Sequence, residues 1–386
     1  MIEMNNIKQK LATAEISYRN KFQCVGSDCN LTCCAGWNVH IDKDTYYKYK
    51  SDPLIFKHVS KLKGENVSRT SNTFAKINLK DNGDCPLLDE NMLCNVQKNL
   101  GEKALSKTCS QFPRQDYVIN NIQTKALTLG CPEVVKLAVF DDSPTEVVAS
   151  VDITTSESSI ATAQALINFL KNSSRPSWQK LLVISSTMKV ADQKTRLNYF
   201  KLSEVLRNIE ANLGDSTIDN NSIFQVETLY PVIAVDRLEK QRITLSNIKQ
   251  NSRLYIDQNG PNLEQRVKKY VLASELFKRT EAGGNYSWLD KTVANEIFKM
   301  HSKLGGDSAV AQETVTEIIL ISAMANFFTI LNFGYNDFKV SKDDFANTIA
   351  LIYRKLGHND VHLQLIKKQL ISKYSDHHSS SCLLLA

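Results

Sequence analysis

Cysteine is the residue type whose placement in this sequence points most plainly to chemistry. Of the nine cysteines, eight fall between residues 24 and 131, and the ninth is far downstream at Cys382. The eight are Cys24, Cys29, Cys33, Cys34, Cys85, Cys94, Cys109 and Cys131. Thiolates gathered in this way bind zinc or the iron of an iron–sulfur cluster, whereas a disulfide framework needs an oxidising compartment. The first ten residues are polar and no apolar signal segment follows them, so we expect a cytoplasmic protein with a metal site.

The cysteine spacing leaves three interpretations open. Cys29 and Cys33 have the separation of a zinc-binding pair, but the directly adjacent Cys33 and Cys34 are unusual for a zinc ribbon. An iron–sulfur cluster also takes four thiolates, and the Cys-Pro step seen at Cys85 and Cys131 recurs beside cluster ligands. The spacing therefore favours an iron–sulfur cluster over zinc, and zinc over disulfides.

Short motifs surround the cysteines and carry a resemblance. They are Cys24-x4-Cys29-x3-Cys33-Cys34-Ala35-Gly36-Trp37, Cys85-Pro86-Leu87-Leu88, Cys94, Cys109-Ser110-Gln111-Phe112-Pro113-Arg114 and Cys131-Pro132-Glu133. Over residues 18–140 they resemble the flagellin lysine-N-methylase family, whose cysteine pattern is shared with a broader set of zinc- or iron-chelating domain proteins. Over residues 150–386 the resemblance rests on length and helical character alone.

The resemblance implies an activity and its cofactors. It implies methyl transfer from S-adenosylmethionine to lysine ε-amines on the surface of flagellin, with an iron–sulfur cluster of the four-iron type, or zinc in its place, held by the eight cysteines. A single cluster needs only four of them. The radical S-adenosylmethionine signature C-x3-C-x2-C is absent, because Cys34 follows Cys33 directly, and so is a Gly-rich methyltransferase fingerprint. The sequence therefore identifies neither catalytic nor donor-binding residues. The alternative function is a non-catalytic metal-chelating structural or assembly protein.

Other residues near the cysteines are weaker candidates. A lysine substrate must lose its proton, and Tyr46, Tyr47 and Tyr49 with Asp42 and Asp44 could assist, although a solvated helix face is the favoured interpretation. His40 and His58 could be metal ligands, but ordinary surface or packing roles are favoured for both. Trp37 could shield a cluster from water, and core packing explains it equally well. Arg114 could bind an anionic group, but a surface salt bridge is the favoured interpretation.

Composition narrows the class of protein. The chain has 386 residues, of which 42% are hydrophobic and 23% charged, so a folded protein is expected. The net charge of +6 is too weak to indicate nucleic-acid binding. The apolar stretch Ile318–Phe333 is shorter than a membrane span and contains Asn326 and Asn332, which favours a buried core helix. We expect flagellin as protein partner, no nucleic acid and no membrane, with the oligomeric state left open.

Few glycines and prolines and a long helical periodicity predict a mostly α fold. We expect a cysteine-rich metal module with short strands over residues 17–140, a linker over 141–158, a larger all-α domain over 159–375 and a flexible tail over 376–386. In the module we expect a strand at Ser17–Gln23, a helix over Lys43–Lys50, a hairpin turning at Asn120-Asn121 and a helix from Pro132. In the all-α domain, i, i+3, i+4 spacing begins at Ile160. Further helices are expected at Trp178–Val190, Arg196–Leu213, Leu263–Thr280, Thr292–Leu304, Thr314–Phe333, Asp343–Leu356 and Val361–Tyr374.

Overall fold

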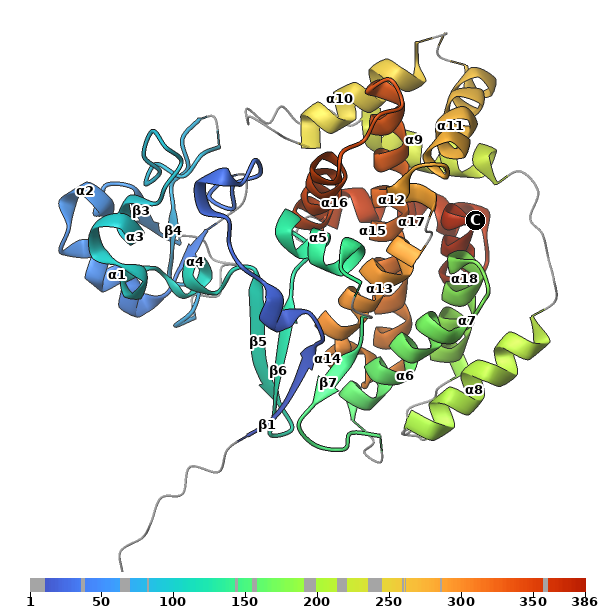
Figure 1. Cartoon of the computed structure of the whole chain (residues 1–386), viewed down its shortest axis with the longest axis horizontal. Coiled ribbons are helices and arrows are strands. Elements are labelled where there is room, and N and C mark those ends of the chain that lie inside the picture. Colours follow the sequence, from blue (N-terminus) through green and yellow to red (C-terminus); the bar gives the residue numbers. More distant parts are fainter. Residues whose placement is uncertain are drawn as a thin grey trace, which may run out of the picture.

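The chain folds into a small cysteine-bearing lobe and a larger helical body, joined by a sheet (Figure 1). The computed structural model describes residues 11–35, 39–62, 70–81, 83–142, 145–154, 158–190, 199–213, 221–234, 245–258, 260, 262–284, 287–356 and 360–386. Within these ranges the chain is mostly α, as predicted. Trp37 lies outside the described residues, so its predicted role stays untested.

The lobe, which we define as residues 39–111, has a core of its own. Its three strands form an antiparallel sheet in the order β2-β4-β3, and its helices are short. The elements are β2 (His40–Ile41), α1 (Lys43–Lys50), α2 (Pro53–Phe56), β3 (Val59–Lys61), β4 (Ala75–Ile77), α3 (Asn95–Leu100) and α4 (Lys107–Gln111). The predicted helix α1 is confirmed. Asp42 is its N-cap, and the Asp42 carboxylate accepts a hydrogen bond from the Thr45 N–H.

A four-stranded sheet connects the lobe to the body. Its order is β5-β6-β1-β7, with β1 parallel to β6 and the other pairs antiparallel. The strands are β1 (Ala12–Ile16), β5 (Arg114–Ile119), β6 (Ile122–Leu127) and β7 (Val147–Ala149). The hairpin between β5 and β6 turns at Asn120 and Asn121, whose φ angles of 49° and 62° suit asparagine in a tight hairpin turn.

The structure of this sheet differs from two expectations drawn from the sequence. The strand expected at Ser17–Gln23 is wrong: the strand ends at Ile16, and Arg19–Lys21 is a 3-10 turn. The residues expected to form a linker, 141–158, include β7, which pairs with β1. A strand of three residues gives too short an alternation to be recognised against a polar background.

The four-stranded sheet shares the core of the helical body. The cysteine-rich part therefore does not end at residue 140, the boundary expected from the sequence. The Tyr18 hydroxyl donates a 2.6 Å hydrogen bond to Asn295, whose amide donates at 3.0 Å to the Leu127 carbonyl. The Tyr117 hydroxyl donates to the carbonyl of Lys299. Helix α5 (Pro132–Phe140) packs into the same core. Residues 112–140 belong to the body because their apolar side chains pack into its core. Their position in the sequence does not reveal this packing.

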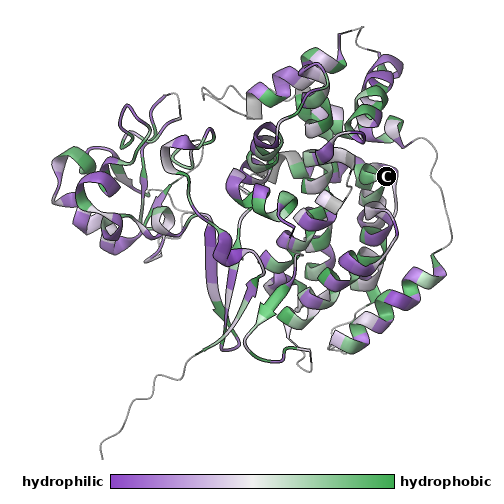
Figure 2. Ribbon diagram, in the orientation of Figure 1, coloured by the Kyte–Doolittle hydropathy of each residue, from purple (hydrophilic) through white to green (hydrophobic). Residues whose placement is uncertain are grey.

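The body is a helical assembly around one long apolar helix. Its helices are α6 (Ser159–Asn172), α7 (Ser177–Val190), α8 (Tyr199–Asn212), α9 (Ser222–Ala234), α10 (Leu245–Ile256), α11 (Leu263–Phe277), α12 (Glu281–Gly284), α13 (Ser287–Lys299), α14 (His301–Leu304), α15 (Ser308–Tyr335), α16 (Lys342–Leu356), α17 (Asp360–Lys373) and α18 (His377–Ser381). Helix α15 is long and apolar enough to cross a membrane, but 94% of its most apolar window is buried inside the protein, as predicted for a core helix. Figure 2 shows hydrophobic residues running through the centre of the body, while β5 and β6 are largely hydrophilic.

The last residues pack against the body, which contradicts the expected flexible tail. Residues 376–386 form α18 and a 3-10 turn over Cys382–Leu385, and Cys382 and Leu384 are fully buried. The amide of Gln225 donates a 2.6 Å hydrogen bond to the carbonyl of Ala386. The apolar side chains of Cys382–Leu385 are covered by the body, and this burial holds the segment against it.

Candidate metal centre

Six of the eight predicted ligand cysteines line one cavity of about 180 Å³ on the side of the lobe that faces the sheet. They are Cys24, Cys33, Cys34, Cys85, Cys94 and Cys109. The walls between them are largely apolar, with Val39, Ile41 and Ile77 from the lobe sheet. Cys85 is buried, while Cys24 and Cys109 are exposed at the surface. A ring of thiols between apolar walls is the environment in which proteins hold soft metals.

Tight local turns bring these cysteines together from distant parts of the sequence. The Cys85 N–H donates a 2.7 Å hydrogen bond to the carbonyl of Cys34, which fixes the first cysteine group against the second. Cys94 immediately precedes helix α3 and pairs with Leu88 in an isolated bridge. Cys109 lies in the first turn of α4, where the Ser106 hydroxyl caps the helix. Gly26, with a φ of 59°, makes the turn after Cys24.

Cys29 and Cys131 lie next to this cavity but do not line it. Cys29 lines a neighbouring cavity of about 240 Å³, together with Asp84 from the lobe and Arg354 from helix α16 of the body. Cys131 is buried and is the N-cap residue of α5. The structure therefore brings six predicted ligands together and places the other two beside Arg354.

The thiols differ in how readily they ionise. A hydrogen bond from the Cys34 thiol, together with the charge of Arg354, lowers the pKa of Cys33 to about 7, although burial opposes the shift. The same hydrogen bond and burial raise the pKa of Cys34. Burial raises the pKa of Cys85 to about 11 and that of Cys131 to about 12. Cys33 is therefore the thiol that would ionise first near neutral pH, and a bound metal would be needed to ionise its buried neighbours.

The spacing of the sulfur atoms bears on which metal fits. Thiolates that share one tetrahedral zinc ion at bonds of about 2.3 Å lie about 3.8 Å from one another. Within the part of the chain that the structure describes, no three cysteine sulfurs lie within 4.8 Å of one another. Six of the thiols therefore line a cavity without converging on one position inside it. The described sulfurs are farther apart than the four ligands of one closed tetrahedral zinc site.

The remaining sequence candidates separate into cavity residues and ordinary core or surface residues. Tyr49 and Arg114 both line the cysteine cavity, and the Arg114 guanidinium lies 5.0 Å above the ring of Phe22. Tyr46, Tyr49 and Asp42 are buried, so the expectation of a solvated face is wrong for them. It holds for Tyr47, which is half exposed, and for Asp44, which is exposed. The expectation fails because the lobe wraps the aromatic side of α1 against its sheet. His40 and His58 line neither cavity.

Asp42 has a structural role in the lobe. Its carboxylate accepts hydrogen bonds from the backbone N–H groups of Thr45 and Lys107, each at 3.0 Å. Burial alone would raise the pKa of Asp42, but these hydrogen bonds outweigh it and lower the pKa. Because Lys107 begins α4, Asp42 ties α1 to the helix that carries Cys109.

One further group of metal-ligand side chains lies at the opposite end of the chain, away from the cysteines. Ligand atoms of Glu313, His377 and His378 lie within 4.8 Å of one another. The Lys367 ammonium is paired with the Glu313 carboxylate, and Thr316 hydrogen-bonds His378 at 2.7 Å. A cation placed there would have to compete with a lysine that is itself buried.

The comparisons with known proteins identify the family. Residues 163–384, more than half of the chain, match the family model described as the FliB lysine N-methylase C-terminal domain. The chain belongs to the flagellin lysine-N-methylase family. It is 37% identical over 140 residues to the lysine-N-methylases of Salmonella typhimurium and Salmonella choleraesuis, and 36% identical over 135 residues to the flagellar biosynthetic protein FliU of Salmonella muenchen.

These lysine-N-methylase relatives cover the chain only in part. The match spans 34% of this chain and 34% of each of the two lysine-N-methylases, against 80% of the FliU protein. No solved structure is similar to the chain. The family domain at 163–384 contains helix α16 and Arg354 but none of the eight clustered cysteines, so in this lysine-N-methylase family member the cysteine site and the family domain are separate segments that meet in space.

Proposed function

We propose that this protein transfers methyl groups from S-adenosylmethionine to surface lysines of flagellin, and that its cysteine cavity holds an iron–sulfur cluster. The observation that carries the activity is the match of residues 163–384 to the lysine N-methylase domain. The names of the curated relatives, lysine-N-methylase and a flagellar biosynthetic protein, support a flagellar protein as the substrate.

The reaction makes specific demands on the enzyme. The lysine ε-ammonium first loses a proton, and the neutral amine then attacks the donor's methyl group, so that the new N–C bond forms as the S–C bond breaks and a neutral thioether leaves. A lysine reaches the required uncharged state most readily where water is excluded. Glu102 lines the cysteine cavity and is exposed, so it can attract an incoming ammonium before the apolar walls displace its water.

The cofactor proposal rests on the donor set. Six thiols line the cavity, which is more than the four that one cluster needs. Among the described residues, no three cysteine sulfurs lie within 4.8 Å of one another, and this spacing supports the cluster. A cluster bound there would supply a fixed charge and a potential electron carrier. The residues of the chain itself would hold it, keep water away and place it beside the region where α16 meets the lobe.

The activity is tested by co-expressing the protein with flagellin in a host that lacks its own lysine methylase. Mass spectrometry of the flagellin should show increments of one methyl group on exposed lysines. The matched comparison is Cys34→Ser, which alters the cavity, against Cys382→Ala, which alters a buried cysteine of the helical body. Unmodified flagellin with the wild-type protein would favour the non-catalytic chelating function instead.

The cofactor is tested separately by anaerobic purification. We expect iron and acid-labile sulfide in the protein, with a broad visible absorption that bleaches on reduction. Stoichiometric zinc without iron would refute the cluster while leaving the methyl transfer open to its own test.

A further inference from the structure

Arg354 is a buried cation whose hydrogen-bond partners, in the part of the chain that the structure describes, are neutral carbonyl groups. Its side chain is 4% exposed and reaches from the last turn of α16 toward the cysteine segments. Its Nε and Nη2 donate to the carbonyl of Gly130 at 2.9 and 2.8 Å, and its Nη1 donates to the carbonyl of Thr32 at 2.8 Å. Among the described residues, no carboxylate oxygen lies within salt-bridge distance of it.

A guanidinium in this position needs a compensating charge. Removing a charged group from water is costly unless an opposite charge accompanies it, and backbone carbonyls supply only dipoles. The carboxyl end of α16 contributes a favourable dipole, but that effect is small beside the cost of burial. Lys180, for comparison, is also buried and has an acidic partner, the Asp290 carboxylate, at 2.7 Å. Arg354 is therefore arranged for an anion that the carboxylates of the described residues do not provide.

The anions at hand are the cysteine thiolates. Thr32 directly precedes Cys33, and Gly130 directly precedes Cys131, so the guanidinium holds both cysteine segments by the residue before the sulfur. Burial lowers the pKa of Arg354, and the charges of ionised sulfurs at Cys33, Cys131, Cys29 and Cys34 oppose that lowering. Arg354 also lines the cavity beside Cys29.

We propose that Arg354 is a positioning residue of the metal centre: it clamps the Cys29–Cys33 and Cys131 segments and its charge balances the excess negative charge of the thiolate-bound metal. This inference rests on the proposed function, since it takes the cysteines to be ionised by a metal. Four thiolates around a divalent zinc ion, for example, carry a net charge of about −2. The helical family domain thereby contributes to a metal site whose ligands all lie outside it.

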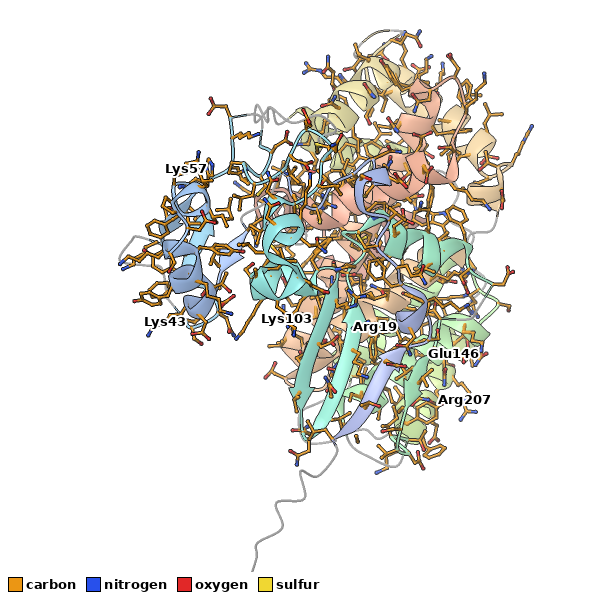
Figure 3. All side chains as sticks on the ribbon, turned by 60° about the vertical axis from the view of Figure 1, so that its left-hand side comes forward. Arg19, Lys43, Lys57, Lys103, Glu146 and Arg207 are labelled. Atoms are coloured by element: carbon orange, nitrogen blue, oxygen red, sulfur yellow. The ribbon has the colours of Figure 1, made fainter. Side chains whose placement is uncertain are left out.

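The test separates the charge of Arg354 from its hydrogen bonds. Arg354→Lys keeps the charge and loses the planar fork, whereas Arg354→Gln keeps a donor and loses the charge. The control is Arg207→Gln on the exposed side of α8, labelled in Figure 3. Each protein is purified anaerobically, its iron and sulfide per chain are measured, and its midpoint potential is found by reductive titration followed by visible absorption.

We expect Arg354→Gln to lose iron or to shift the midpoint potential to a more negative value, because a nearby positive charge stabilises the more negative reduced cluster. Arg354→Lys should stay closer to the wild type, and Arg207→Gln should equal it. The proposal is overturned if Arg354→Gln has wild-type iron and potential. If Arg354→Lys loses the metal as completely as Arg354→Gln, the charge-balancing role is overturned and the clamp by the hydrogen-bonding fork is supported.

If the proposed iron–sulfur cluster is wrong, metal analysis of the wild-type protein will show it. If the wild type contains zinc, the same variants are compared by the rate at which a chelator removes zinc, and Arg354→Gln should lose it several-fold faster than Arg354→Lys. Equal rates would overturn the role of Arg354. A wild-type protein that binds neither metal would refute both the cofactor and this inference.

Discussion

The Nη1 of Arg354 lies 2.8 Å from the carbonyl oxygen of Thr32, although 322 residues separate the two in the chain. Thr32 stands inside the first cysteine group, and Arg354 belongs to the segment that matches the lysine N-methylase domain. The contact joins the two halves of the chain at the candidate metal centre. In Figure 1 the cysteine segment that contains Thr32 lies between the lobe and the helices α5 and α16.

The effect of a cysteine substitution on metal content should depend on whether the cysteine lines the cavity. Cys85→Ser removes a buried thiol that lines the cavity, so we expect loss of most of the bound metal. Cys382→Ala removes an equally buried thiol that packs against α7 and α15, so it should lower stability without lowering metal content. Metal analysis of both purified variants checks this, and equal metal loss would show that the effect of Cys85→Ser is a general loss of folding.

Metal removal should open the lobe and spare the body. The lobe has a small core of its own, and the free energy of metal binding stabilises the folded state of such ligand-rich units. Residues 112–140 share the core of the body and should stay folded. Limited proteolysis after chelation should therefore cut within residues 39–111. Equal cleavage of lobe and body would indicate one interdependent unit.

Asp42 should matter more than its neighbour on the same helix. Asp42→Ala removes the cap of α1 and the link to α4, which should lower the free energy of unfolding of the lobe by about 1–2 kcal/mol. Asp44→Ala, an exposed position in the first turn of the same helix, should cost less than about 0.5 kcal/mol. Thermal unfolding of the two variants compares them, and equal losses would argue against the link to α4.

His301 should make the body sensitive to mild acid. It is fully buried, its Nδ1 lies 2.9 Å from the Ser159 hydroxyl, and its ring stacks on Tyr117. Burial lowers the pKa of His301 from 6.5 to about 4. The unfolded chain then takes up a proton at higher pH than the folded protein, so stability is complete above pH 6.5 and falls as the pH drops toward 4. The loss is on the order of 3 kcal/mol at the low end.

The measurement for His301 is the free energy of unfolding of the wild type and of His301→Gln between pH 7 and 4. The wild type should lose stability more steeply than the variant, because glutamine takes up no proton in this range. Other groups contribute to both curves, so the difference between them is the informative quantity. Parallel curves would contradict the assignment.

Features with a local signal could be predicted from the sequence. The apolar run around Ile318–Phe333 is hydrophobic on every face and became the core of α15. The paired Asn120 and Asn121 between alternating segments predicted the hairpin, and Pro132 predicted the first turn of α5. The gathering of six cysteines followed from their clustering in the sequence together with the family resemblance.

Features that depend on distant contacts could not be predicted. Arg354 is one of two neighbouring basic residues at the end of an amphipathic helix, a pattern typical of solvent-exposed positions, and only folding places it beside the cysteines. Helix α9 was missed because Pro231 interrupts its interior, and α10 because its polar residues weaken the periodicity. The C-terminal segment became ordered because the body covers its apolar residues, which nothing within the segment itself indicates.

The central claim is methyl transfer by a protein whose cysteine cavity holds a metal centre. Its most direct test is the intact mass of purified flagellin after incubation with S-adenosylmethionine and the anaerobically purified protein, with and without its metal. We predict that flagellin gains mass in steps of one methyl group only with the metal-loaded protein. Flagellin of unchanged mass with the loaded protein would contradict the proposed activity, and equal methylation by the metal-free protein would contradict the role of the cysteine site.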